Sequence, residues 1–319
     1  MKVLRAMLHP MLMEHCAVTE AQLEGTDLRL ATVLGVRMQQ LGPEGALSEL
    51  ADAMKVRFPA IDWHWLSPDH SVDDLARYAE ILTSASLPAH RDESVRWEQQ
   101  SACSRETHAQ NLLWGPQRNF ALLLHGLGGQ STGASASSIA LLGMLEGELE
   151  ARWSLTLEAR LHARATAMDA ALRQHNDRGL RAHFAAVEVT AQSVGIAQVG
   201  SPEVFRIRGQ KLEALSADDS LAGLLHARGI ASDRSPEEAR DLYVRALGEA
   251  QPTQPTVRIA RRCEGDRYLL IDRRGDAGRV GIETLMPMMR SPWSAESLID
   301  KLREVSAGRW ELSLITLTV

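Results

Sequence analysis

The stretch FALLLHGLGGQSTG, residues 120–133, joins an apolar run to a glycine-rich loop. The apolar residues 120–124 form a short continuous run, which is typical of a buried strand. The run ends at His125, followed by Gly-Leu-Gly-Gly, and a backbone with so few side chains can approach a ligand closely or direct its N–H groups at an anion. The stretch therefore predicts a buried strand that leads into a ligand-binding loop.

A serine hydrolase is one interpretation of this loop, and the order of residues argues against it. The segment AQSVG, residues 191–195, is one residue away from a Gly-x-Ser-x-Gly nucleophile elbow, with Ser193 at its centre. Such enzymes place an acid and then a histidine after the serine, but the last histidine of this chain is His226. It comes too soon to leave room for the acid and the rest of the sheet. Without a base the serine is not activated.

Composition excludes several classes of protein. The net charge is −6 and there is no basic block, so we expect no nucleic-acid partner. No apolar run reaches membrane-spanning length, and the first residues lack the continuous apolar core of a signal peptide, so we expect no membrane partner. The three cysteines, Cys16, Cys103 and Cys263, are widely spaced and match neither a disulfide framework nor a zinc site. We expect a cytoplasmic protein.

The chain divides into two predicted domains. Residues 1–92 contain amphipathic helical stretches and predict a small, mainly helical N-terminal domain whose role the sequence does not indicate. A linker is expected at residues 86–94. Residues 93–319 contain many short strand-like runs, with a long helical block inserted at 137–175, and this grouping indicates an α+β layered domain.

Four segments of the second domain carry a resemblance to a known family. They are, in order, VGSPEVFRIRGQKLEALSADDSL from residue 199, LLHARGIASDRSPEEARDLYVRALG from 224, CEGDRYLLIDRRG from 263 and GRWELSLITLTV from 308. Their order and spacing resemble the PP2C family of metal-dependent Ser/Thr protein phosphatases, with HGLGG in place of the family's Asp-Gly-Met-Gly-Gly. The resemblance implies an α/β/β/α sandwich of two antiparallel sheets over residues 93–319.

The same resemblance implies a cluster of aspartates holding two Mg²⁺ or Mn²⁺ ions, and this sequence departs from it. The positions that correspond to the family's metal ligands are occupied by Gln110 or Asn111, His125, Gly126, Arg273 and Trp310. None has a carboxylate, although Gly126 retains the glycine whose carbonyl binds metal in the family. A one-residue gap would bring Asp272 or Glu311 to a ligand position. With the ungapped alignment we expect no catalytic residue, no cofactor and no bound metal.

Three arginines are candidate phosphate-binding residues. Arg105 corresponds to the family arginine that contacts the substrate phosphate, and Arg273 and Arg274 follow the buried strand beside the former metal cavity. Arginine binds phosphate through paired hydrogen bonds. The alternative is that Arg273 only neutralises nearby acids.

The sequence leads us to expect a non-enzyme. It would be a catalytically inactive PP2C-like pseudophosphatase, acting as a binding or regulatory protein in a bacterial Ser/Thr phosphorylation pathway. Its partner would be a protein, either phosphorylated itself or a member of a Ser/Thr kinase pathway. Two alternatives stay open: a divergent but active metal-dependent Ser/Thr protein phosphatase, and a scaffold component of a larger bacterial assembly with no phosphate role.

Overall fold

The computed structural model describes most of the second half of the chain and part of the first. The described residues are 8, 12–13, 30–57, 72, 75, 95–103, 111–114, 119–128, 130–151, 156–175, 179–230, 239, 242–275, 297, 300, 304 and 310–319. The chain forms two compact units, Met1–Pro88 and Ala89–Val319. No helix within these described ranges is long and apolar enough to cross a membrane.

The first unit contains the helices α3, Leu30–Val33, and α4, Gly35–Arg57. Inside α4, Gly42 has φ 75° and ψ 165°, so the helix breaks there and restarts. The Gly-Pro pair at this position explains the break, because proline removes a backbone donor and restricts the residue before it. Leu34, Leu50 and Met54 are buried on the helical pair. The break falls in LGPEG, residues 41–45, where the sequence predicts a helix stop followed by a fresh helix start.

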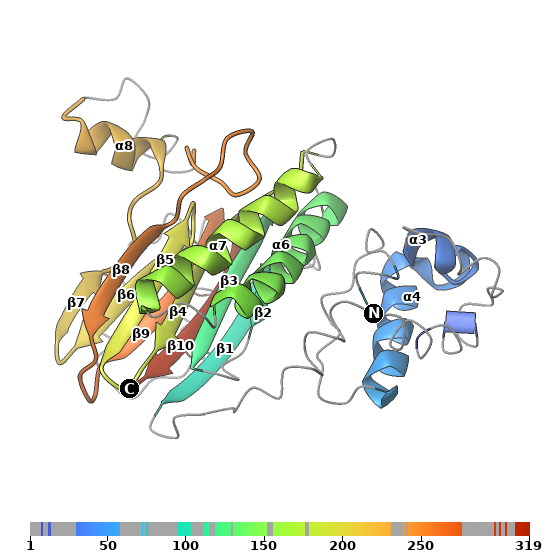
Figure 1. The fold of residues 1–319 in the computed structure, drawn as a ribbon, viewed down its shortest axis with the longest axis horizontal. Coiled ribbons are helices and arrows are strands. Elements are labelled where there is room, and N and C mark those ends of the chain that lie inside the picture. Colours follow the sequence, from blue (N-terminus) through green and yellow to red (C-terminus); the bar gives the residue numbers. More distant parts are fainter. Residues whose placement is uncertain are drawn as a thin grey trace. The chain divides into compact units, whose positions relative to one another are not determined.

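The second unit contains two antiparallel sheets of five strands each (Figure 1). The sheet called here the first sheet has the order β1, β10, β9, β6, β7, and the second sheet has the order β2, β3, β4, β5, β8. Strands of the first sheet are β1 Arg96–Cys103, β10 Trp310–Thr318, β9 Arg267–Gly275, β6 Glu203–Arg208 and β7 Lys211–Ala214. Strands of the second sheet are β2 Asn111–Trp114, β3 Phe120–Leu127, β4 Arg181–Val189, β5 Ser193–Val199 and β8 Thr256–Arg261.

The main hydrophobic core lies between the two sheets. Alternate residues of each strand share a face, and the inward-facing residues of β3, β4 and β9 are apolar over most of their length. Buried members of this core include Leu123 on β3, Val187 on β4 and Leu270 on β9. Following the same alternation along each strand to its end leads to a polar residue: His125, His183 and Asp272 respectively.

Two long helices cover the second sheet (Figure 1). They are α6, Gln130–Ala151, and α7, Leu157–Gln174, so the single predicted helical block is in fact a helical pair. The hydroxyl of Thr156 caps α7 by accepting from the backbone N–H of Ala159 at 3.1 Å. Gly143 lets the helices approach closely, because a Cβ there would lie 2.6 Å from the carbonyl oxygen of Ala167. A short helix, α8, Leu221–Ala227, follows β7.

The predicted α+β fold with two stacked antiparallel sheets is confirmed. Most of the helical stretch predicted at residues 294–305 lies outside the described residues. Strand β1 was not predicted, because RWEQQSAC has a polar composition and is a strand only through its pairing with β10.

Candidate functional site

A histidine and an aspartate meet where the polar end of the core begins. His125 extends from β3 of the second sheet and Asp272 from β9 of the first sheet, and His125 Nδ1 lies 3.2 Å from Asp272 Oδ2. Their side chains are only 5% and 0% exposed. A buried carboxylate requires a partner, and this one is held by the imidazole from the opposite sheet. The contact ties the two sheets together at the glycine-rich loop.

A second buried histidine lies beside the first. His183 on β4 pairs in register with His125 on β3, and the two ring centroids are 6.4 Å apart. Nδ1 of His183 is 3.0 Å from the hydroxyl oxygen of Ser201, and Tyr243 packs edge-on against the imidazole with 5.2 Å between the ring centroids. Imidazole, hydroxyl and carboxylate groups are therefore concentrated at one end of an otherwise apolar core.

The turn after β5 holds His183 in place. Gly200 has φ 85°, and a Cβ at this position would lie 2.2 Å from Cδ2 of His183, so only glycine fits. The backbone N–H of Gly200 donates to Oδ2 of Asp219 at 2.8 Å, and Arg245 Nη1 donates to Oδ1 of the same carboxylate at 2.9 Å. Asp219 is buried and paired, so it fixes the turn and leaves His183 little freedom to move.

The glycine-rich loop brings backbone groups close to His125. A Cβ on Gly126 would lie 1.7 Å from the carbonyl oxygen of Gly133, so this close approach excludes every other residue. Strand β3 ends at Leu127 and α6 begins at Gln130, which places the N-terminus of a long helix near His125. The first turn of a helix has N–H groups without intrahelical acceptors and carries partial positive charge. The arrangement suits a phosphate or another anion.

The structure places several of the residues that the resemblance singled out. Asn111 on β2 is the register partner of His125, so these two positions are neighbours in the second sheet. Arg273 and Arg274 lie in β9, where their register partners are Leu312 and Glu311 of β10. Trp310, at the start of β10, pairs in register with Gly275. Arg105 and Gln110 lie outside the described residues.

Asp272 is the β9 residue that contacts His125, one position before Arg273. The ungapped alignment gave the ligand position to Arg273, and the gapped alternative gave it to Asp272. Strand alternation from Tyr268 and Leu270, both buried in the core, carries the information that Asp272 faces inward. His183 and Ser201 were not among the predicted site residues. The alternation of His183 with the apolar residues Ala185 and Val187 could have identified His183 as an inward-facing residue.

A pair of hard divalent ions does not fit the described donors. Mg²⁺ prefers six oxygen ligands in octahedral geometry, whereas the carboxylate of Asp272 faces an imidazole. In the part of the chain that the structure describes, no group of three or more His, Cys, Asp or Glu side chains is arranged to hold a metal ion.

Comparison with known proteins gives matches by structure but not by sequence. No protein-family model and no curated protein matches the sequence. The Ser/Thr phosphatase PstP/Ppp of Mycobacterium tuberculosis matches with a TM-score of 0.60 and 21% identity, over 70% of this chain and 98% of that chain. The second unit has the fold of a PP2C-type phosphatase.

Two further solved structures match over a similar share of the chain. The catalytic domain of PstP in complex with two manganese ions matches with a TM-score of 0.60 and 21% identity, over 70% of this chain and 97% of that chain. PppA, described as a key regulatory component of the T6SS in Pseudomonas aeruginosa, matches with a TM-score of 0.54 and 18% identity, over 69% of this chain and 96% of that chain.

These matches overturn the expectation that the PP2C-like chain is not an enzyme. The solved structures that share its fold are Ser/Thr phosphatases, one of them with its two metal ions bound. The expectation rested on counting carboxylates at aligned positions. Such a count misses Asp272, which the packing of the two sheets brings to His125.

Proposed function

We propose that the chain is a divergent PP2C-type Ser/Thr protein phosphatase, with His125 as its catalytic acid–base and Asp272 as the residue that positions it. The observation that carries this proposal is the buried His125–Asp272 pair, 3.2 Å between Nδ1 and Oδ2, at the sandwich end where the glycine-rich loop meets the start of α6. A histidine oriented by a buried carboxylate is a recurring acid–base arrangement in catalytic centres.

The chemistry required is the hydrolysis of a phosphate ester. Water attacks phosphorus and forms a P–O bond, the bond from phosphorus to the serine or threonine oxygen breaks, and that oxygen receives a proton. A histidine can take the proton from the attacking water and return one to the leaving oxygen. Asp272, whose Oδ2 lies 3.2 Å from Nδ1 of His125, fixes the orientation of the ring.

Binding of the phosphate is assigned to two groups of donors. The turn at Gly128 and the N-terminus of α6 offer backbone N–H groups, which suit a dianion. Arg105, Arg273 and Arg274 stay candidates for paired hydrogen bonds to the phosphate oxygens. The substrate would be a phosphorylated protein of a Ser/Thr kinase pathway in the cytoplasm.

The test measures phosphate release by the full chain from phosphoserine and phosphothreonine peptides, with no added metal and with Mg²⁺, Mn²⁺ or Zn²⁺. We expect His125→Asn to lower kcat by about 100-fold or more, and Asp272→Asn to lower it by roughly tenfold. His162→Asn, which removes an imidazole from α7, is the matched control and should retain activity. No phosphate release under any condition, or full activity of a folded His125→Asn variant, would overturn the proposal.

A further inference from the structure

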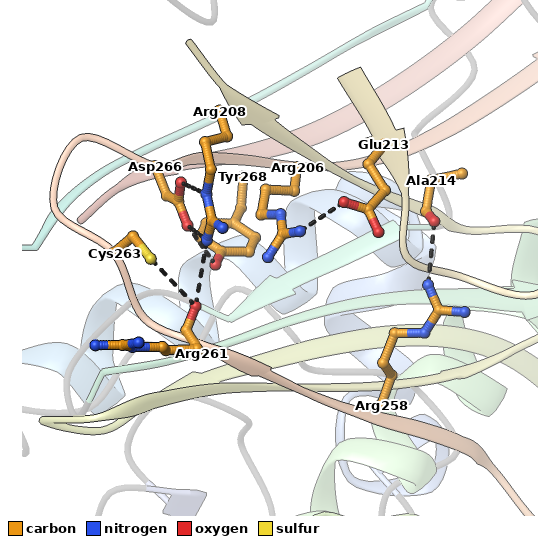
Figure 2. A network of polar contacts seen from close by, with 9 residues as sticks. All are labelled: Arg206, Arg208, Glu213, Ala214, Arg258, Arg261, Cys263, Asp266 and Tyr268. Atoms are coloured by element: carbon orange, nitrogen blue, oxygen red, sulfur yellow. Dashed lines mark hydrogen bonds and ion pairs between the residues drawn. The ribbon is translucent and has the colours of Figure 1, made fainter. Parts of the chain in front are cut away.

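Basic side chains gather at the end of the sandwich where Asp266 precedes β9 (Figure 2). They come from β6, β7 and β8, and they are Arg206, Arg208, Lys211, Arg258 and Arg261. Arg208 bonds to Asp266, immediately before the first residue of β9, whereas Asp272 lies six residues after Asp266. At about 3.3 Å per strand residue, Asp266 and Asp272 are roughly 20 Å apart. This basic end is therefore separate from the candidate catalytic centre.

Two of these arginines are already paired with acids. Arg208 donates from Nε and Nη2 to the two oxygens of Asp266, each at 2.7 Å, and this hydrogen bonding raises the pKa of Arg208. Arg206 Nη2 donates to Oε2 of Glu213 at 2.5 Å, and that hydrogen bond lowers the pKa of Glu213. Lys211 and Arg258 also lower the pKa of Glu213 through their charges, so this one carboxylate is shared among three cations.

The other three cations have no ion-pair partner within the described ranges. Lys211, Arg258 and Arg261 are exposed. Arg258 Nη1 donates only to a neutral group, the carbonyl oxygen of Ala214, at 3.2 Å. In a chain of net charge −6, the five basic side chains of this end outnumber Glu213 and Asp266, the two carboxylates that pair with them in the described ranges. Such a patch attracts an anionic partner.

These cations flank a strand edge. Strand β8 is last in the order of the second sheet, so its outer edge has no strand partner among the described elements. Arg258 and Arg261 are an odd number of residues apart, so their side chains leave opposite faces of β8. Ile259 lies between them and is 42% exposed. Edge strands accept extended peptides through main-chain hydrogen bonds, and side chains of such a peptide alternate between the two faces.

We propose that β8 is a docking strand for an extended acidic segment of a protein partner. Neighbouring acidic residues of that segment would point to opposite faces and meet Arg258 on one and Arg261 on the other. Lys211 adds charge from the adjacent β7, and Ile259 offers an apolar contact.

Two other occupants fit the surface less well. Single-stranded nucleic acid needs aromatic side chains for base stacking, and the exposed large hydrophobic residues in the described ranges include no Phe, Tyr or Trp. Pairing of β8 with β8 of a second copy would bring the like charges of Arg258 and Arg261 together, which is unfavourable across strands.

The test is fluorescence anisotropy with the full chain and a labelled peptide of about ten residues, rich in Glu and Val. We expect saturable binding that weakens as salt is raised, because exposed charges are screened. The variant Lys211→Gln/Arg258→Gln/Arg261→Gln should bind at least tenfold more weakly. Arg181→Gln is the matched control, since Arg181 is an exposed cation at the other end of the same unit, and it should bind like the parent.

Three results would overturn the proposal. The first is equal binding of the same peptide with Gln in place of Glu, or of the triple variant. The second is displacement of the peptide by an oligonucleotide at lower concentration than by unlabelled peptide. The third is a dimer in light scattering that the triple substitution alters. Hydrolysis of a small phosphate ester should be unchanged in the triple variant, so failure of docking is distinguishable from failure of the proposed phosphatase activity.

Discussion

His125 and Asp272 belong to different sheets, yet Nδ1 of the histidine lies 3.2 Å from Oδ2 of the aspartate. Apolar residues fill the space between the sheets up to this level, and polar residues replace them beyond it. The pair therefore marks the boundary between the apolar core and the polar end of the sandwich. Its geometry depends on how the two sheets are stacked, so changes that disturb the stacking near it should reduce activity as well as stability.

Replacement of Gly200 by alanine should displace His183. The new Cβ would lie 2.2 Å from the imidazole, and the left-handed φ of 85° adds a backbone cost. We expect a loss of roughly 2–4 kcal/mol in the free energy of unfolding, measured by urea denaturation. Gly209→Ala is the control, because Gly209 has φ 59° but no atom within 4 Å of its Cβ position. It should lose only about 1 kcal/mol. Equal losses for both variants would contradict the steric argument.

Tyr268 should make the protein less stable at high pH. Burial and the neighbouring charge of Asp266 raise the pKa of Tyr268 to about 12. Tyrosine in the unfolded chain titrates near pH 10. The contribution of Tyr268 to the free energy of unfolding is therefore fully present below pH 10 and is lost as the pH rises toward 12. The loss should reach about 3 kcal/mol. Tyr268→Phe removes this titration, so the unfolding free energy of the parent should fall relative to that of the variant by about 3 kcal/mol between pH 10 and pH 12. Parallel curves would show that Tyr268 does not titrate this way.

Magnesium should not bind as a pair of ions. The described part of the site offers the carboxylate of Asp272 facing an imidazole, and a binuclear Mg²⁺ or Mn²⁺ centre needs several carboxylates. Calorimetric titration at millimolar metal should show no two-site isotherm, and a chelator should leave Tm unchanged. A stoichiometric two-site isotherm would show that side chains outside the described residues complete the centre.

Residues 89–319 should fold without the first unit. Their two sheets share a continuous core, and the helices α6 and α7 cover the second sheet. A fragment of these residues should unfold in one cooperative transition, with coincident curves from circular dichroism and tryptophan fluorescence. A fragment that is insoluble or unfolds without cooperativity would indicate that the first unit covers one of its apolar faces.

The sequence by itself determined the fold class. The apolar run before His125, the alternation in HFAAVEV and RYLLIDR, and the four family-like segments predict buried antiparallel strands, because those patterns follow from local geometry and burial. The helix break in LGPEG can equally be predicted from the sequence. Strand β1 cannot, because its polar residues become a strand only through their pairing with β10.

Only the tertiary structure decided the site. A shift of one residue along a strand moves a side chain to the opposite face, so an alignment that differs by a single gap cannot choose between Asp272 and Arg273. The packing of the two sheets selects Asp272, because it sets this side chain against His125. The register of β3 and β4 places His183 beside His125. The place of Arg258 and Arg261 on an edge strand depends in the same way on which strand ends the sheet.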